Sequence, residues 1–236
     1  MERTDILSTL VASGTGTTPE ALAELAVEFD IPLADLLVIA GHPVPAELLP
    51  PKRDAALMKR FAHHVSHCDH AQLASLEGFV RSLPHLEAPG PYVQPVSAFF
   101  MPAEGGLGSV FNGLIRNRGF SIKELPYLAL SLSTLRGMVR DWPPSPHRRH
   151  QLCAVAGPLG WWLPDLFAVV GEPYSADFRP PVLCHHAGGV FRAAVSLTEA
   201  QLAECVQQME RLGAREDRAA WQPVSQGFVE ECPDFP

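Results

Sequence analysis

The chain has 236 residues and a formal net charge of −8, with 18 Lys/Arg against 26 Asp/Glu. Its 47% hydrophobic content is enough for the packed core of one large domain or two small ones. The acidic balance excludes a protein that coats DNA with its whole surface, because such a protein would be basic throughout.

Cysteine usage and the apolar pattern predict where the protein resides. The five cysteines are odd in number, widely scattered and without a Cys-x-x-Cys pair, which favours reduced thiols over a disulfide framework. No apolar run follows the first residues, and no stretch of about 18 uninterrupted apolar residues is present. We therefore expect a soluble, cytoplasmic protein with no signal peptide and no membrane association.

The first segment, residues 1–83, has the pattern of amphipathic helices. Thr18 places a capping hydroxyl directly before Pro19, a residue favoured at the first helical position. A second helix is predicted over residues 33–40, where Gly41 ends it. The first of these helices has apolar residues at i, i+3, i+4 and i+7: Leu22, Leu25, Ala26 and Phe29. No stretch of the chain shows sustained alternation, so the predicted fold class is all-α.

A histidine cluster at the end of this segment is the one metal-like pattern. His63 and His67 are four residues apart and share a helix face, and Cys68 or His70 would complete a zinc site. However, Asp69 is placed to cap the following helix, which would direct His70 elsewhere. We therefore favour surface histidines at a helix junction, and we expect neither a metal nor another cofactor.

Three further segments follow the first one. Residues 84–106 are rich in proline and glycine, which break helices and mark a linker. Residues 107–213 form a second helical unit, and residues 214–236 form an acidic tail that contains proline. Within the second unit, Trp161 and Trp162 are assigned to packing in the core or between units, with a partner surface as the alternative.

The two units resemble each other. Sliding the sequence by 130 positions brings residues 22–51 over residues 152–181, with ten identities where chance would give roughly two. The matched pairs include Leu22/Leu152, Asp35/Asp165, Gly41/Gly171 and Pro43/Pro173. This predicts an internal duplication. The first copy is truncated, because the sequence that would match its missing helices would have to precede Met1.

Positive charge is concentrated in one stretch of the second unit. Residues 111–150 hold seven Lys/Arg against two acids, a net +5, so that the rest of the chain carries −13. The first unit has no Lys/Arg between residues 4 and 51 and six acids from Glu20 to Glu47. A local basic face on an acidic chain is the electrostatic footprint of a confined nucleic-acid site. The first unit is therefore expected to pack or to bind a protein partner.

The same segment resembles a known family. Gly119-Phe-Ser121-Ile-Lys-Glu124-Leu125 followed by Ser131-Leu-Ser133-Thr134-Leu135 is similar to the helix-turn-helix regulators of the lambda-repressor/Cro (XRE-like) type. The resemblance covers residues 108–172 as a five-helix domain and residues 4–41 as a truncated second copy. It implies a DNA-binding transcription regulator whose recognition helix spans Ser131 to Trp142.

Helical spacing indicates the face that would read DNA. Leu135, Met138, Val139 and Trp142 form the predicted buried face of that helix. Arginine pairs bidentately with guanine in the major groove, and small residues allow close approach of the helix. The predicted DNA-binding residues on the helix are Ser133, Thr134, Arg136, Gly137 and Arg140. Those expected to meet flanking phosphates are Arg116, Arg118, Lys123, Arg148 and Arg149.

Two classes of function stay open at this stage. The leading interpretation is a regulator that binds double-stranded DNA as a homodimer, because such regulators need two recognition helices and this chain supplies one. The first unit, residues 1–83, or the long last helix would provide the dimer surface. The alternative is a protein-interaction module that derives from a helix-turn-helix fold and has lost DNA binding. No catalytic motif is present, so we expect no enzyme activity.

Overall fold

The chain adopts an all-α fold in the computed structural model, which describes residues 3–13, 16–51, 53–84, 107–120, 132–140, 148–174 and 182–212. These ranges contain α-helices and short 3₁₀ turns and no β-strand, which confirms the predicted fold class. The predicted linker (apart from Pro84) and the predicted acidic tail lie outside the described residues. The helices are α1 (Arg3–Ser13), α2 (Pro19–Glu28), α3 (Leu33–Ile39), α4 (Ala55–His67), α5 (His70–Ser82), α6 (Leu107–Asn117), α7 (Leu132–Arg140), α8 (Arg148–Leu159), α9 (Leu163–Val170), α10 (Val182–Ala193) and α11 (Glu199–Arg211).

The helix ends follow local sequence chemistry. Thr18 caps α2 through its side chain, and Gly171 ends α9 with a positive φ of 69° that glycine adopts without strain. Asp69 opens α5 with a capping box, as its position predicted. Before α11, residues 194–196 form a 3₁₀ turn, and Thr198 then opens the helix as its cap.

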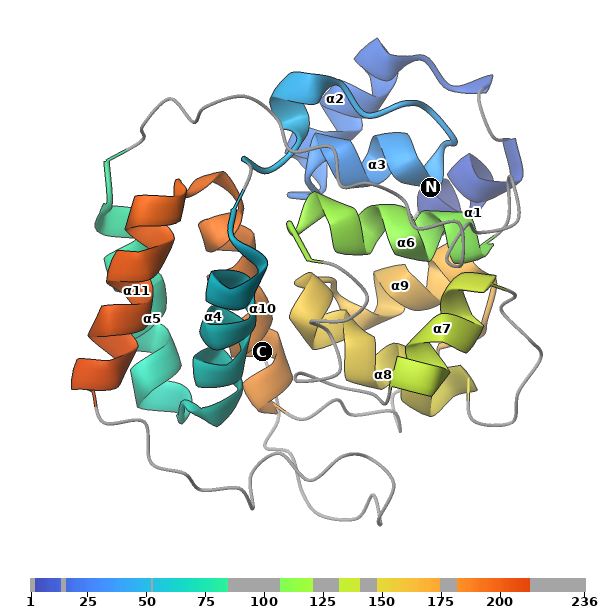
Figure 1. Ribbon diagram of the computed structural model, residues 1–236. Coiled ribbons are helices and arrows are strands. Elements are labelled where there is room, and N and C mark those ends of the chain that lie inside the picture. Colours follow the sequence, from blue (N-terminus) through green and yellow to red (C-terminus); the bar gives the residue numbers. More distant parts are fainter. Residues whose placement is uncertain are drawn as a thin grey trace.

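Four helices form a bundle in which the two halves of the chain interleave. Helix α4 packs on α11, and α5 packs on α10, so each half contributes two helices (Figure 1). The apolar faces meet in the middle, where the Phe61 and Phe191 rings lie 5.6 Å apart in an edge-to-face contact. The helices α5 and α11 occupy matching positions along the two segments, and both begin with a capping box. The duplication itself stays a prediction.

The remaining helices form a second group beside the bundle. Figure 1 shows α6 between α3 above it and α7, α8 and α9 below it. Helix α6 packs on both α3 and α7, and α8 packs on both α9 and α10, which joins the group to the bundle. Helix α1, the first of the chain, packs on α9 of the second half. The buried apolar residues of both predicted units therefore belong to one continuous core.

A buried carboxylate joins the two halves within this second group. Asp35, near the start of α3, is 0% exposed and accepts hydrogen bonds on both oxygens. Arg118 donates to Oδ1 at 3.0 Å and to Oδ2 at 2.6 Å. Asn117 donates to Oδ1 and Trp161 donates to Oδ2, each at 2.9 Å. Arg118 also donates through Nε to the Leu159 carbonyl at 2.8 Å, so the pair holds α3, α6 and the end of α8 together.

The matching aspartate of the second half is held much less well. Asp165, in the first turn of α9, is 1% exposed, and its partner is Arg3 of α1, with Nη2 2.5 Å from Oδ2. Within the described part of the chain, Arg3 is thus the one residue that pairs with this carboxylate, whereas three residues donate to Asp35. Burial raises the pKa of Asp165, and the charge and the hydrogen bond of Arg3 offset only part of that shift.

A buried arginine ties the start of α4 to the connection between α10 and α11. Arg53, directly before α4, donates to the carbonyls of Leu197 at 3.0 Å and Ala194 at 2.8 Å, and also to that of Val195. These carbonyls lie just after α10, where a cation is favoured by the orientation of the helix dipole. Burial lowers the pKa of Arg53 to about 10, so it remains charged at neutral pH.

The contrast between the two aspartates generates a stability prediction. Replacing Asp35 with Asn leaves the buried Arg118 guanidinium without its counter-charge, a change that costs about 3–5 kcal/mol in such pairs. Asp165→Asn removes a charge that burial disfavours, so we expect its free energy of unfolding to be unchanged or higher than that of the wild type. Denaturant unfolding of both variants at neutral pH measures the two effects. Equal losses at the two positions would contradict this account of the pairs.

Titration of Asp165 gives a second prediction. Its pKa in the folded protein lies above the 3.8 of an ordinary aspartate, so the folded state takes up this proton first as the pH falls. Relative to Asp165→Asn, the wild type should therefore gain stability as the pH falls through the raised pKa towards 3.8. Unfolding free energies of both proteins, measured from neutral pH to about pH 4, test this. A wild type that loses stability relative to the variant on acidification would show that the shift has the opposite sign.

Candidate nucleic-acid interface

Helix α7 lies where the recognition helix was predicted, and its buried face is the predicted one. Leu135, Met138 and Val139 are buried and pack on α6, while the fourth predicted position, Trp142, lies outside the described residues. The two helices cross closely at Gly108 of α6, where an added Cβ would overlap the Val139 carbonyl. This crossing fixes the orientation of α7, because no larger residue fits at position 108.

The opposite face of α7 carries the predicted reading positions. Arg136 is exposed, and Gly137 is partly exposed beside it. The backbones of Ser133, Thr134 and Arg140 belong to α7, whereas their side chains lie outside the described part of the structure. Arg136 and Arg140 are four residues apart on one helix, so their Cβ atoms lie on the same side of it.

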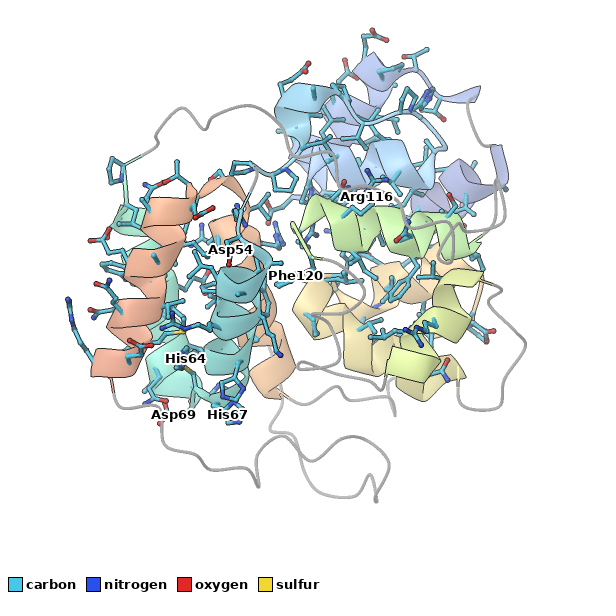
Figure 2. All side chains as sticks on the ribbon, viewed as in Figure 1. Asp54, His64, His67, Asp69, Arg116 and Phe120 are labelled. Atoms are coloured by element: carbon cyan, nitrogen blue, oxygen red, sulfur yellow. The ribbon has the colours of Figure 1, made fainter. Side chains whose placement is uncertain are left out.

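The predicted flanking cations have different environments. Arg116 lies on α6 and is partly exposed (Figure 2). Arg148 and Arg149 form the first turn of α8, but their side chains are outside the described structure. Lys123 is also outside the described residues.

One predicted phosphate contact is wrong. Arg118 is only 2% exposed, and its guanidinium is occupied by Asp35 and the Leu159 carbonyl. Solvent and a phosphate group therefore cannot reach it. The physical reason is the burial of Asp35, whose charge requires a buried cation in return. Arg118 thus neutralises a charge inside the protein and adds nothing to the positive potential at the surface.

Sequence reasoning missed this ion pair, although the repeat contained an indication of it. Asp35 and Asp165 match in the 130-residue comparison and occupy the third position of two short apolar helices. An acid kept between buried leucines is unusual, because carboxylates are rarely buried without a partner. Trp161 belongs to the same network and is buried, which confirms its assignment to packing between the halves. Trp162, by contrast, is 60% exposed.

The histidine cluster lies at the far end of the bundle, away from α7. Figure 2 shows His64 and His67 at the lower end of α4, next to Asp69 and distant from Arg116. The His63 and His67 rings are 4.2 Å apart, and His67 Nδ1 lies 2.7 Å from the His63 carbonyl. Among the described residues, no group of three potential ligands is arranged to hold a metal ion.

Two of the five cysteines have described side chains. Cys68 and Cys205 are free and buried in the bundle. Burial raises the pKa of Cys68 to about 11 and that of Cys205 to about 12, so both stay protonated at neutral pH.

The helices of the described ranges are not of the kind that crosses a bilayer, since none of them is both long and apolar enough. Comparisons with protein-family models, with curated proteins and with solved structures give no match to this chain.

Proposed function

We propose that the protein is a DNA-binding transcriptional regulator that inserts α7 into the major groove. The observation that carries the proposal is the division of α7 into two faces. Leu135, Met138 and Val139 anchor one face on α6, and Arg136 stands exposed on the other. A helix held rigidly by one face and presenting arginine on the other is the arrangement used for major-groove reading.

The distribution of charge supports this orientation. Arg136 is exposed on α7, whereas the exposed acids Glu20, Glu24 and Glu28 lie on α2. A polyanion is attracted by the first helix and repelled by the second, so approach with α7 forward is favoured. In the bound state, Arg136 and Arg140 would contact base edges and the adjacent phosphates. Arg116 lies on the side of α6 that faces α3 and is therefore away from this contact (Figure 2).

A helix-turn-helix-derived interaction module without DNA binding is the second candidate. The burial of Arg118 favours it, because the surface then has one cation fewer than the sequence count of the basic segment. Binding to DNA itself separates the two candidates.

The proposal predicts a steep dependence of DNA affinity on salt concentration. Each phosphate that the protein neutralises adds a slope of about −0.9 to the plot of log K against log salt for duplex DNA. The double variant Arg136→Ala/Arg140→Ala should bind more weakly at low salt, with a slope flatter by about one unit for each phosphate that it no longer neutralises. Fluorescence anisotropy of a labelled duplex over a salt series measures both quantities.

A matched pair of arginines in the bundle provides the control. Arg60 and Arg81 are exposed on α4 and α5, and their side chains are 58% and 66% exposed. The variant Arg60→Ala/Arg81→Ala removes the same charge and should keep the wild-type slope. No binding of the wild type at low salt, or equal effects of the two double variants, would refute the DNA-binding proposal and favour the interaction module.

A further inference from the structure

Two histidines share the last turns of α4 at its solvent-accessible side. His63 is exposed and His67 is partly exposed, so a small ion from solution can reach both side chains. They are four residues apart, a spacing that places two side chains one above the other on a helix. Their ring centres are 4.2 Å apart. The end of α4 therefore brings two imidazole rings together at an accessible place.

The separation of the two rings suits ligands of a single metal ion. With a metal–nitrogen bond of about 2.1 Å, an ion lies about 3.2 Å from the centre of each imidazole ring that binds it. Two rings that bind the ion at about a right angle then have centres about 4.5 Å apart. The His63 and His67 rings are 4.2 Å apart and tilted by 47° to each other. A small rotation of the exposed His63 side chain covers the difference.

The helix backbone fixes the form of the His67 ring that a metal ion requires. Its Nδ1 lies 2.7 Å from the His63 carbonyl. A carbonyl oxygen only accepts hydrogen bonds, so Nδ1 carries the proton, and in the neutral ring the lone pair is on Nε2. Metal-binding histidines are usually supported in this way, because a donated N–H to a backbone carbonyl fixes the tautomer and makes the other nitrogen more basic. This observation is independent of the distance between the rings.

The charges around the pair favour a cation on balance. The carbonyl end of a helix carries negative potential, and the exposed Asp69 lies beside His67 (Figure 2). Lys59, one turn before His63, acts in the opposite direction, whereas Arg60 is paired with Glu210 at 2.6 Å.

The third histidine of α4 belongs to a different contact. His64 Nε2 is 3.6 Å from the carboxylate of Glu210, so its ring faces α11. The pair is therefore distinct from its histidine neighbour.

We propose that His63 and His67 together bind a divalent transition-metal ion of the group Zn²⁺, Ni²⁺ and Cu²⁺. These ions prefer imidazole nitrogen, whereas Mg²⁺ and Ca²⁺ prefer oxygen ligands. The two rings occupy two coordination positions, and water occupies the others. Cys68 is 3% exposed and does not share this surface, so the site differs from the three-ligand zinc site considered from the sequence. Helical spacing alone did not favour a metal here; the ring separation and the bonded Nδ1 are what the structure adds.

The bound ion would act on the end of α4. The two rings meet only when this part of the chain is helical, so the ion binds the folded protein in preference to the unfolded chain and stabilises it. A site with two protein ligands is also more open than a structural site closed by four, so it exchanges its ion with the solution.

Copper is the probe for the first experiment, because Cu²⁺ binds nitrogen sites most tightly among these ions. The full chain, freed of any purification tag, is titrated with Cu²⁺ and followed by electron paramagnetic resonance. The wild type should bind one more ion per chain than His63→Ala/His67→Ala, with two coupled imidazole nitrogens in its spectrum. The other histidines of the chain are the same in both proteins, so the difference between them reports the pair.

His64→Ala is the matched control. It removes a histidine of the same helix that faces Glu210, so it should keep the wild-type affinity. Each single variant, His63→Ala or His67→Ala, should weaken binding by at least about 10- to 100-fold, the loss caused by removing a supporting partner of a metal ligand. Alanine is the best helix former, so α4 should stay folded, which circular dichroism checks. Equal Cu²⁺ stoichiometry in the wild type and the double variant, or an equal loss in His64→Ala, overturns the proposal.

Thermal unfolding gives a second readout that needs no copper. The Tm of the wild type should rise with Zn²⁺ concentration, and that of His63→Ala/His67→Ala should rise less, whereas Mg²⁺ should change neither. A Zn²⁺ shift of the same size in both proteins contradicts the site. The pair lies at the far end of the bundle from α7, so these outcomes do not depend on whether α7 binds DNA (Figure 1).

Discussion

The Asp35 carboxylate lies where α3, α6 and the start of α9 meet. A buried charge is tolerated only if hydrogen-bond donors of the protein replace the water that hydrated it. Arg118, Asn117 and Trp161 supply those donors from the other half of the chain. The position of α6 follows from this requirement, because two of the donors lie at its end. Helix α7 rests on α6 in turn, so the orientation of the proposed reading surface depends on a charge buried beneath it.

The same requirement explains how basic residues of one segment come to serve different purposes. Arg118 and Arg116 are two positions apart, yet one is enclosed with Asp35 and the other reaches the surface. Arg53 shows a third solution, a buried cation held by backbone carbonyls at the end of α10 rather than by a carboxylate. In each case the neighbouring helices determine whether the arginine is buried or exposed. A count of basic residues along the sequence therefore overstates the positive charge at the surface.

Local features of the sequence predicted the helices well. Thr18 and Asp69 acted as caps, Gly41 and Gly171 ended their helices, and the spacing of Leu135, Met138 and Val139 identified the buried face of α7. These features depend on contacts within a few residues. The burial of Arg118 depends on Asp35, which is 83 positions away, and the docking of α1 on α9 spans an even longer separation. No periodicity in the sequence reports such distant partners, so the composition of the proposed interface was only partly predictable.

The interleaved bundle has a consequence for how the two halves can differ. In a symmetric homodimer every substitution occurs twice, so a basic patch on one subunit is repeated on the other. Here α4 with α5 and α10 with α11 belong to one chain, and each helix pair can change independently while their shared core is preserved. The two halves of this chain do differ in charge, because α2 of the first half carries the exposed acids Glu20, Glu24 and Glu28, whereas α7 of the second half carries the exposed Arg136. Covalent continuity thus allows two helical units to share one core and still carry charges of opposite sign.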